Sequence, residues 1–196
     1  MQTYPRGFKC SLAVLVLLLS ITVTAAASEE VVLAEQQLAH DAIGEFAAEL
    51  KQALVSAMGE QGPVAAIAVC AIEAPQIAAR ISSEYGVAVS RTSLRVRNPG
   101  NAPLPEWQRS VLLDWQAAHE AGTLAPDAEY FQSTGRGGFR LMQPIRVQPL
   151  CLTCHGTNIE PQVLTAISER YPADEATGYA VGDVRGAFVV VGNDRE

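Results

Sequence analysis

The sequence predicts an α+β domain in which two helical regions precede an antiparallel sheet of about four strands. Two observations lead to this prediction. Apolar residues recur every three or four positions over much of residues 28–86, as in amphipathic helices. Four later segments are rich in β-branched and aromatic residues, as in strands, and clusters of Gly, Pro and Asn separate several of them.

The N-terminus has the features of a secretory signal peptide over residues 1–27. Arg6 and Lys9 precede an apolar run that ends in an Ala-x-Ala pattern, so cleavage is predicted before Ser28. The alternative is a retained membrane anchor, but the run is short for a spanning helix. Cys10 lies before the apolar run and would leave with the signal peptide. We therefore expect a periplasmic protein.

The predicted mature chain, residues 28–196, is a single acidic domain. The 14 basic residues of the whole chain include Arg6 and Lys9, so 12 remain against 21 acidic residues, a net charge of −9. Such a chain is a poor candidate for binding nucleic acid or anionic lipid, so we expect neither nucleic acid nor a membrane as partner after cleavage. It is long enough to bury one core.

The helical regions are predicted over residues 28–63 and 63–86. The first has apolar residues at helical spacing and ends at Gly59, Gly62 and Pro63. In the second, Pro75 lacks a backbone N–H and its ring clashes with the carbonyl of Ala71, so a bend is expected near residues 71–74.

The remaining elements follow from alternation and turn residues. A helix with Pro105 near its first turn and Gly122 past its end lies between the first and second predicted strands. A short helix follows the third strand. In chain order the segments are a strand over 87–97, a turn cluster over 98–105, a helix over 105–122, a hairpin of 128–134 and 139–147 around a turn at 135–138, a helix over 161–172, and a strand over 186–192.

Three cysteines remain after cleavage, an odd number for an exported protein. Cys151 and Cys154 stand with His155 at Cys-x-x-Cys-His spacing, and Cys70 is left over. A zinc site would need two further ligands, which the scattered remaining residues do not supply as a second pair. A redox dithiol or local disulfide is the other alternative, but a thioredoxin-like dithiol belongs to a βαβ context that is missing here.

Covalent haem explains all three residues of the motif. Two thioether bonds use Cys151 and Cys154, and His155 is delivered to the iron as the proximal ligand. Gly156 is expected to give the backbone freedom beside the ring. We therefore predict one haem c, attached outside the cytoplasm.

The second axial ligand is less clear from the residues. Packing or solvation explains four of the five candidates better than ligation, namely His40, Met58, His119 and Met142. Cys70 has small neighbours at helical spacing and precedes the bend at Pro75, but a buried, inert thiol explains it equally well.

A family resemblance favours Cys70. The segments AVCAIEAPQIAARIS, RTSLRVRNPGNAP, CLTCHG and ERYPADEATGYAVGDVRGAF together resemble a c-type haem family with a PAS-like fold, found as small exported proteins and as extracytoplasmic modules of sensor kinases. In that family the histidine of the attachment motif and a cysteine in the helix that corresponds to AVCAIEAP ligate the iron from opposite sides. The resemblance implies His155 and Cys70 as axial ligands and a PAS-like arrangement of the sheet.

This ligand pair favours a sensor of redox state or of a diatomic gas. A thiolate stabilises ferric iron, and after reduction Cys70 would take a proton and leave, opening a position for NO or CO. A signalling or redox protein is then an expected partner. The alternative is a soluble low-potential electron-transfer cytochrome. A catalytic constellation is not seen, so no enzyme activity is predicted. Arg91, Arg95 and Asn98 are candidates for binding the haem propionates, although a solvated position on the surface explains them equally well.

Overall fold

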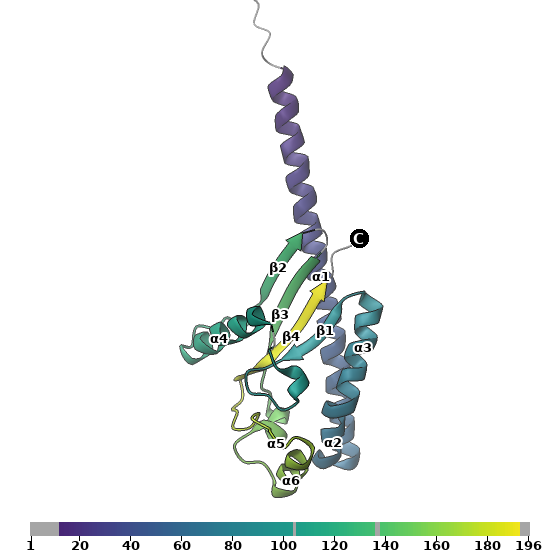
Figure 1. The fold of residues 1–196 in the computed structure, drawn as a ribbon, viewed down its shortest axis with the longest axis vertical. Coiled ribbons are helices and arrows are strands. Elements are labelled where there is room, and N and C mark those ends of the chain that lie inside the picture. The colour runs from purple at the N-terminus through teal and green to yellow at the C-terminus, as the bar shows by residue number, and fades with distance from the viewer. Residues whose placement is uncertain (1–11, 104, 136–137, 193–196) are drawn as a thin grey trace, which may run out of the picture.

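The computed structural model describes residues 12–103, 105–135 and 138–192. Its first helix, α1 (Leu12–Gln61), runs without a break through the predicted cleavage point before Ser28. Figure 1 shows how the later part of this helix passes along the sheet. Arg6, Lys9 and Cys10, on which the signal-peptide prediction partly rests, lie outside the described residues. Export and cleavage stay predictions.

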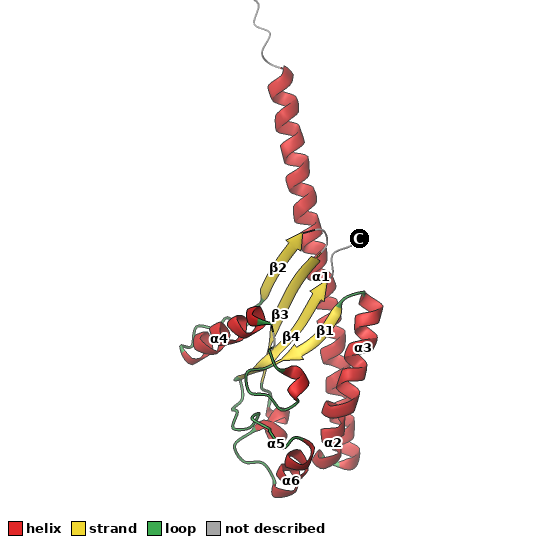
Figure 2. Cartoon of the chain, in the orientation of Figure 1, coloured by secondary structure: helices red, strands yellow, loops and turns green. Residues whose placement is uncertain are grey.

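The four predicted strands form one antiparallel sheet in the order β1-β4-β3-β2 (Figure 2). The strands are β1 (Ala88–Thr92), β2 (Tyr130–Gly135), β3 (Gly138–Arg146) and β4 (Val184–Gly192). The α+β prediction is confirmed. The first strand is shorter than the predicted 87–97, because the backbone N–H of Ser93 bonds to the carbonyl of Asn101 and the chain leaves the sheet there.

Helices cover both faces of this sheet. The middle of α1 and α3 (Ala74–Tyr85) pack on one face, where Phe46, Ile81 and Val190 are buried. Helix α4 (Glu106–Glu120) packs on the other face against Met142 and Val189. Val189 and Val190 point to opposite faces because side chains alternate along a strand.

The second helical region is interrupted where the bend was expected. Helix α2 (Pro63–Ala68) is followed by a π-helical turn, Val69–Glu73, and then by α3. The N–H of Ala74 bonds to the carbonyl of Val69, five residues back. Pro75 cannot donate to Ala71, so the regular α-helical hydrogen-bond pattern is interrupted here. The run Pro63–Tyr85 is long and apolar enough to cross a membrane by length and composition alone, but it contacts α1 and buries Ile81 in the core.

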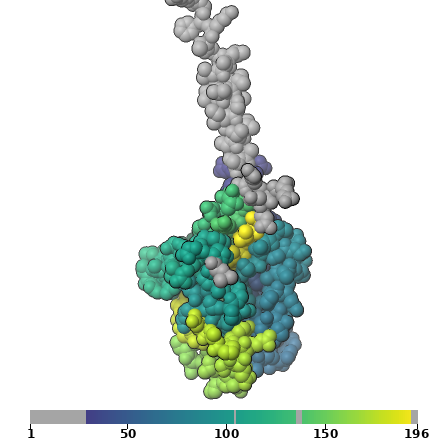
Figure 3. Space-filling view, in the orientation of Figure 1, coloured from purple at the N-terminus to yellow at the C-terminus, as the bar shows by residue number. Residues whose placement is uncertain are grey.

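The segment between β3 and β4 forms one end of the molecule. It contains a 3-10 turn (Pro149–Cys151), the one-turn helix α5 (Leu152–His155) and α6 (Pro161–Arg170). In Figure 3 this yellow-green segment borders the blue surface of the N-terminal helices. Val163 and Ile167 of α6 pack against Ile67 of α2. The Cys-x-x-Cys-His motif is therefore held beside the helical region that carries Cys70.

Candidate functional site

A cavity of about 200 Å³ brings the four predicted site residues together. Cys70 from the π-helical turn, Cys151 from the 3-10 turn, and Cys154 and His155 from α5 all line it. The other walls come from α1, α2, β1, the end of β3 and the turn after it, the residue that follows α6, and the start of β4; they include Leu50, Leu54, Met58, Ala66, Ile67, Arg91, Ile145, Val147, Leu150, Tyr171 and Arg185. Residues more than eighty positions apart thus share one largely apolar cavity.

The motif is presented by two tight turns in succession. The N–H of Cys151 bonds to the carbonyl of Gln148 at 2.9 Å, and the N–H of Gln148 bonds back to the Cys151 sulfur at 3.3 Å. Cys70, Cys151 and Cys154 are free thiols. Among the described residues no three His, Cys, Asp or Glu side chains converge on a metal-sized point, so these groups do not form a zinc site by themselves.

Gly156 is required for space and not for backbone freedom. Its φ of −74° and ψ of −172° are open to any residue. A Cβ at this position would lie 2.7 Å from the carbonyl oxygen of Leu152 and 3.2 Å from the Leu152 Cβ. The expectation that Gly156 gives the backbone conformational freedom beside the haem ring was wrong. Glycine lets the chain leave α5 closely enough for the Gly156 N–H to bond to the Leu152 carbonyl at 3.0 Å.

Substitution of Gly156 by alanine is therefore expected to destabilise the protein by about 1–3 kcal/mol, because the Leu152 backbone must shift. Gly44→Ala is the matched control. Gly44 lies inside α1 with nothing within 4 Å of an added Cβ, so this change is expected to stabilise by about 0.5–1 kcal/mol. Urea unfolding measures both. Equal effects of the two substitutions would contradict the steric argument.

The imidazole of His155 is held in one tautomer. Its Nδ1 lies 2.7 Å from the carbonyl oxygen of Ala176, and since a carbonyl only accepts, Nδ1 carries the proton. Arg185 Nε approaches the same Nδ1 at 3.3 Å. Both nitrogens then bear hydrogen, so this is a contact between two donors and not a hydrogen bond. Nε2 keeps its lone pair, as a metal ligand requires.

The electrostatic environment keeps this imidazole neutral. Burial lowers the pKa of His155 to about 3, and the positive charges of Arg185 and Arg97 act in the same direction. The hydrogen bond to Ala176 opposes this shift without reversing it. At neutral pH the site therefore offers an unprotonated nitrogen, and no proton has to be displaced before a metal binds.

The haem-free protein is expected to lose stability as the pH falls below about 6.5. In the unfolded chain a histidine binds a proton near that pH, whereas His155 in the fold resists protonation down to about pH 3. The unfolded state thus binds more protons between these values, and stability falls with acidification. Urea titrations at pH 7, 6 and 5 measure this. His155→Gln should flatten the profile relative to His40→Gln; identical profiles for the two variants would contradict the assignment.

A buried ion pair fastens the segment that holds His155. Arg97 donates to both oxygens of Asp174, from Nε at 3.0 Å and from Nη2 at 2.9 Å, and both side chains are 9% exposed. Nη2 of Arg97 also donates to the carbonyl of Cys154 at 2.7 Å. The N–H of Ala176 donates to Asp174 at 2.9 Å. One arginine thereby links the motif to the carbonyl that orients His155.

The π-helical turn brings Cys70 to the cavity wall near Cys154. Ala71, the next residue, packs against the cluster that contains Cys154, Val163 and Ile167. Burial raises the pKa of the Cys154 thiol; Arg97 opposes this, and the nearby Cys70 raises it further. The wider turn changes the directions of the side chains relative to a regular α-helix. The π-helical turn therefore contributes to placing Cys70 on the cavity wall.

Two arginines at the cavity have no carboxylate partner among the described residues. Arg91 lies 5.7 Å from the centre of the Phe46 ring, and burial lowers its pKa. Arg185 donates to the Ser93 hydroxyl at 2.7 Å and to the Arg95 carbonyl at 3.1 Å, and burial lowers its pKa too. Buried cations without counter-ions are costly, and a bound anion relieves that cost.

These positions partly match the sequence expectations for propionate binding. Arg91 was a candidate and lines the cavity. Asn98 instead caps the 3-10 turn Pro99–Asn101, and Arg95 donates to the carbonyls of Glu175 and Thr177. Arg185 was missed: it lies in the segment ERYPADEATGYAVGDVRGAF, which carries part of the family resemblance, but nothing in the sequence places it beside the Cys-x-x-Cys-His motif. Only its position next to His155 and its missing counter-ion identify it.

The other candidate ligands are distributed unevenly. Met58 lines the same cavity as Cys70. Met142 is fully buried in the sheet core, His40 pairs with Glu129, and His119 pairs with Asp183 at 3.2 Å. The cavity therefore offers free thiols, a neutral imidazole with an available Nε2, and uncompensated cations. This donor set fits the haem that the sequence predicts.

Comparison with known proteins agrees with this chemistry. A family model described as Tll0287-like (Tll0287) matches residues 20–192. Among solved structures, the crystal structure of the cyanobacterial heme-protein Tll0287 is similar, with 31% sequence identity and a TM-score of 0.53. The match covers 65% of this chain and 73% of that chain. No curated protein matches.

Proposed function

Because the chain belongs to the Tll0287-like family, we propose that it binds one haem in the cavity lined by Cys70, Cys151, Cys154 and His155. The observation that carries this proposal is the convergence of these four residues on one cavity. The solved relative is a heme-protein, which supports the same cofactor here. Cys151 and Cys154 would hold it as haem c through two thioether bonds, and His155 and Cys70 would supply the protein ligands to its iron.

Each residue has a defined task in this proposal. His155 presents Nε2, since its Nδ1–H is engaged by Ala176. Arg91, which lines the cavity without a carboxylate partner among the described residues, neutralises a propionate carboxylate. The apolar wall formed by α1 and α2 excludes water, which strengthens these charge interactions. The sheet with its flanking helices is the PAS-like frame of the site.

We propose that the protein works as a sensor of redox state or of a small gas such as NO or CO. The cofactor supplies an iron centre that changes oxidation state and, with an open position, binds diatomic ligands. Cys70 would hold ferric iron as a thiolate, and after an electron donor has reduced the iron the Cys70 sulfur would take up a proton and cease to be a ligand. The π-helical turn Val69–Glu73 supports this role, since π-helical turns inserted into α-helices are frequent at functional sites.

The site of action that we propose is the periplasm, with a second protein as receiver of the signal. This part rests on the signal-peptide pattern of residues 1–27 and on the acidic charge of the remainder. Movement of Cys70 would be transmitted along α3, which continues directly from the turn and packs on the sheet.

The experiment is expression with a c-type maturation system, followed by denaturation of the purified protein. We expect haem to stay with the polypeptide, and to be released from the Cys151→Ser/Cys154→Ser variant. Haem released from the wild-type chain would overturn covalent attachment, and no haem at all would overturn the proposal. Reduction and addition of CO then test the sensor role. A thiolate-type Soret band that persists through both would favour the electron-transfer alternative.

A further inference from the structure

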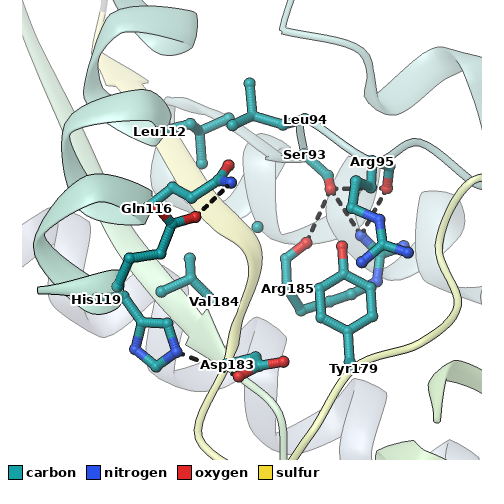
Figure 4. A pocket seen from close by; sticks show the side chains of 12 residues that line it. Ser93, Leu94, Arg95, Leu112, Gln116, His119, Tyr179, Asp183, Val184 and Arg185 are labelled. Atoms are coloured by element: carbon teal, nitrogen blue, oxygen red, sulfur yellow. Dashed lines mark hydrogen bonds and ion pairs between the residues drawn. The ribbon is translucent and has the colours of Figure 1, made fainter. Parts of the chain in front are cut away.

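A second cavity, of about 470 Å³, lies beside the one that contains the motif. It is lined by residues of α4, of the turn after β1, and of the segment that leads into β4 (Figure 4). Ser93, Arg185 and Gly186 line both cavities and thus form a shared wall. Its size falls in the range of small-molecule sites.

One end of this second cavity is cationic. The guanidinium groups of Arg95 and Arg185 lie 4.6 Å and 5.5 Å from the centre of the Tyr179 ring. Arg95 donates through Nε and Nη2 to backbone carbonyls, and Arg185 donates through Nη1 to Ser93 and to the Arg95 carbonyl. Nη1 of Arg95 and Nη2 of Arg185 have no hydrogen-bond or carboxylate partner within the described ranges.

Tyr179 adds a neutral donor at the same end. The residue is 6% exposed, and its hydroxyl makes no hydrogen bond in the part of the chain that the structure describes. This oxygen is not one of the fully buried unpaired side-chain atoms, so it is open to the cavity. Figure 4 places this hydroxyl beside Ser93 and the arginines, on the side of the cavity away from His119. Two guanidinium groups and one phenol are the donors that a carboxylate accepts from.

The opposite end is acidic and already paired. His119 Nε2 lies 3.2 Å from Asp183 Oδ1, and Gln116 donates to Glu120 at 3.0 Å. Figure 4 shows the His119–Asp183 pair at this end of the cavity. A ligand with a second carboxylate would meet Glu120 and Asp183 there. The two ends therefore select for one negative group.

We propose that this second cavity is a binding site for a small organic monocarboxylate, whose carboxylate accepts hydrogen bonds from Arg95, Arg185 and Tyr179. This site goes beyond the proposed haem function. Arg185 connects the two, since its Nε lies 3.3 Å from Nδ1 of His155. A carboxylate on Arg185 in the second cavity would offset part of the positive charge beside that imidazole.

The carboxylate on Arg185 has two possible sources, a free acid or a haem propionate. Isothermal titration of the haem-loaded and haem-free protein with butanoate distinguishes them. We expect saturable binding to both forms. Binding to the haem-free form alone would overturn the proposal in favour of a propionate, and no saturable binding to either would overturn it outright. A chain that fails to bind haem is still informative, because the titration does not depend on haem.

Variants and analogues test the chemistry of this site. Arg95→Gln should weaken butanoate binding about tenfold or more, and Tyr179→Phe should weaken it several-fold while keeping the ring. Arg140→Gln is the charge-matched control, since Arg140 lies over Trp107 and outside the cavity. Succinate should bind more weakly than butanoate, and butanamide should not bind. Equal binding of butanamide, tighter binding of succinate, or an equal loss in Arg140→Gln would each contradict the proposal.

Discussion

Replacement of Cys70 by alanine is expected to change the electron paramagnetic resonance spectrum of the ferric protein from thiolate–imidazole ligation to a different state. The expectation rests on the position of Cys70 on the cavity that also carries His155. A thiolate donates a full negative charge to ferric iron, so its loss should also raise the reduction potential by an amount on the order of 100 mV or more. Redox titration followed by absorbance measures this second effect.

Met58→Ala is the matched control for this substitution. Met58 lines the same cavity and was itself a candidate ligand. Its replacement by alanine therefore also removes a sulfur-containing side chain from the cavity wall and enlarges the cavity. If Cys70 is the ligand, the wild-type spectrum survives in Met58→Ala and is lost in Cys70→Ala. A wild-type spectrum that is already typical of nitrogen or methionine ligation, and unchanged in Cys70→Ala, would show that the axial assignment is wrong.

The helices and strands could be predicted because each has a local cause. Alternating apolar residues in the hairpin and Pro105 at the start of α4 specify their elements without help from the rest of the chain. The bend before Pro75 has such a cause too. The π-helical form of this bend has no such local cause, since a helix interrupted by proline can either kink or widen. Packing of Ala71 against α6 contributes to the widened form.

The attachment motif was visible for the same reason, since its three residues are neighbours. Cys70 was identified first because the predicted mature chain has an odd number of cysteines, and then by family resemblance. Its own segment contains no pattern that indicates which residues it faces. Arg185 and the Arg97–Asp174 pair could not be found in this way. Their roles depend on which residues the fold brings beside them, and Arg97 and Asp174 are 77 positions apart.

Asp174→Asn is expected to produce the largest loss of stability, about 3–5 kcal/mol, because it leaves the buried charge of Arg97 without a counter-ion. Asparagine keeps the size of the side chain and an oxygen acceptor for the Ala176 N–H, so the change tests charge more than shape. Urea unfolding measures the cost. The double variant Arg97→Leu/Asp174→Leu should be less destabilised than Asp174→Asn, since it leaves no unpaired charge.

Glu49→Gln is the surface control for this ion pair. Glu49 also pairs with an arginine, Arg80, but the two side chains are 39% and 41% exposed, so less than about 1 kcal/mol is expected. A cost for Asp174→Asn no larger than that of Glu49→Gln would contradict the importance of the buried pair.

The cost of Asp174→Asn is expected to depend on pH. Burial acts to raise the pKa of the Asp174 carboxyl, but hydrogen bonds from Arg97 and from the Ala176 N–H outweigh it, so the pKa lies below its ordinary value. The stabilisation is then present above the unfolded value of about 3.9 and is lost as the pH falls through the folded value. The difference between wild type and Asp174→Asn should shrink in that range. Because Ala176 also orients His155, the variant should shift the Soret band at neutral pH, which a purely structural ion pair far from the site would not do.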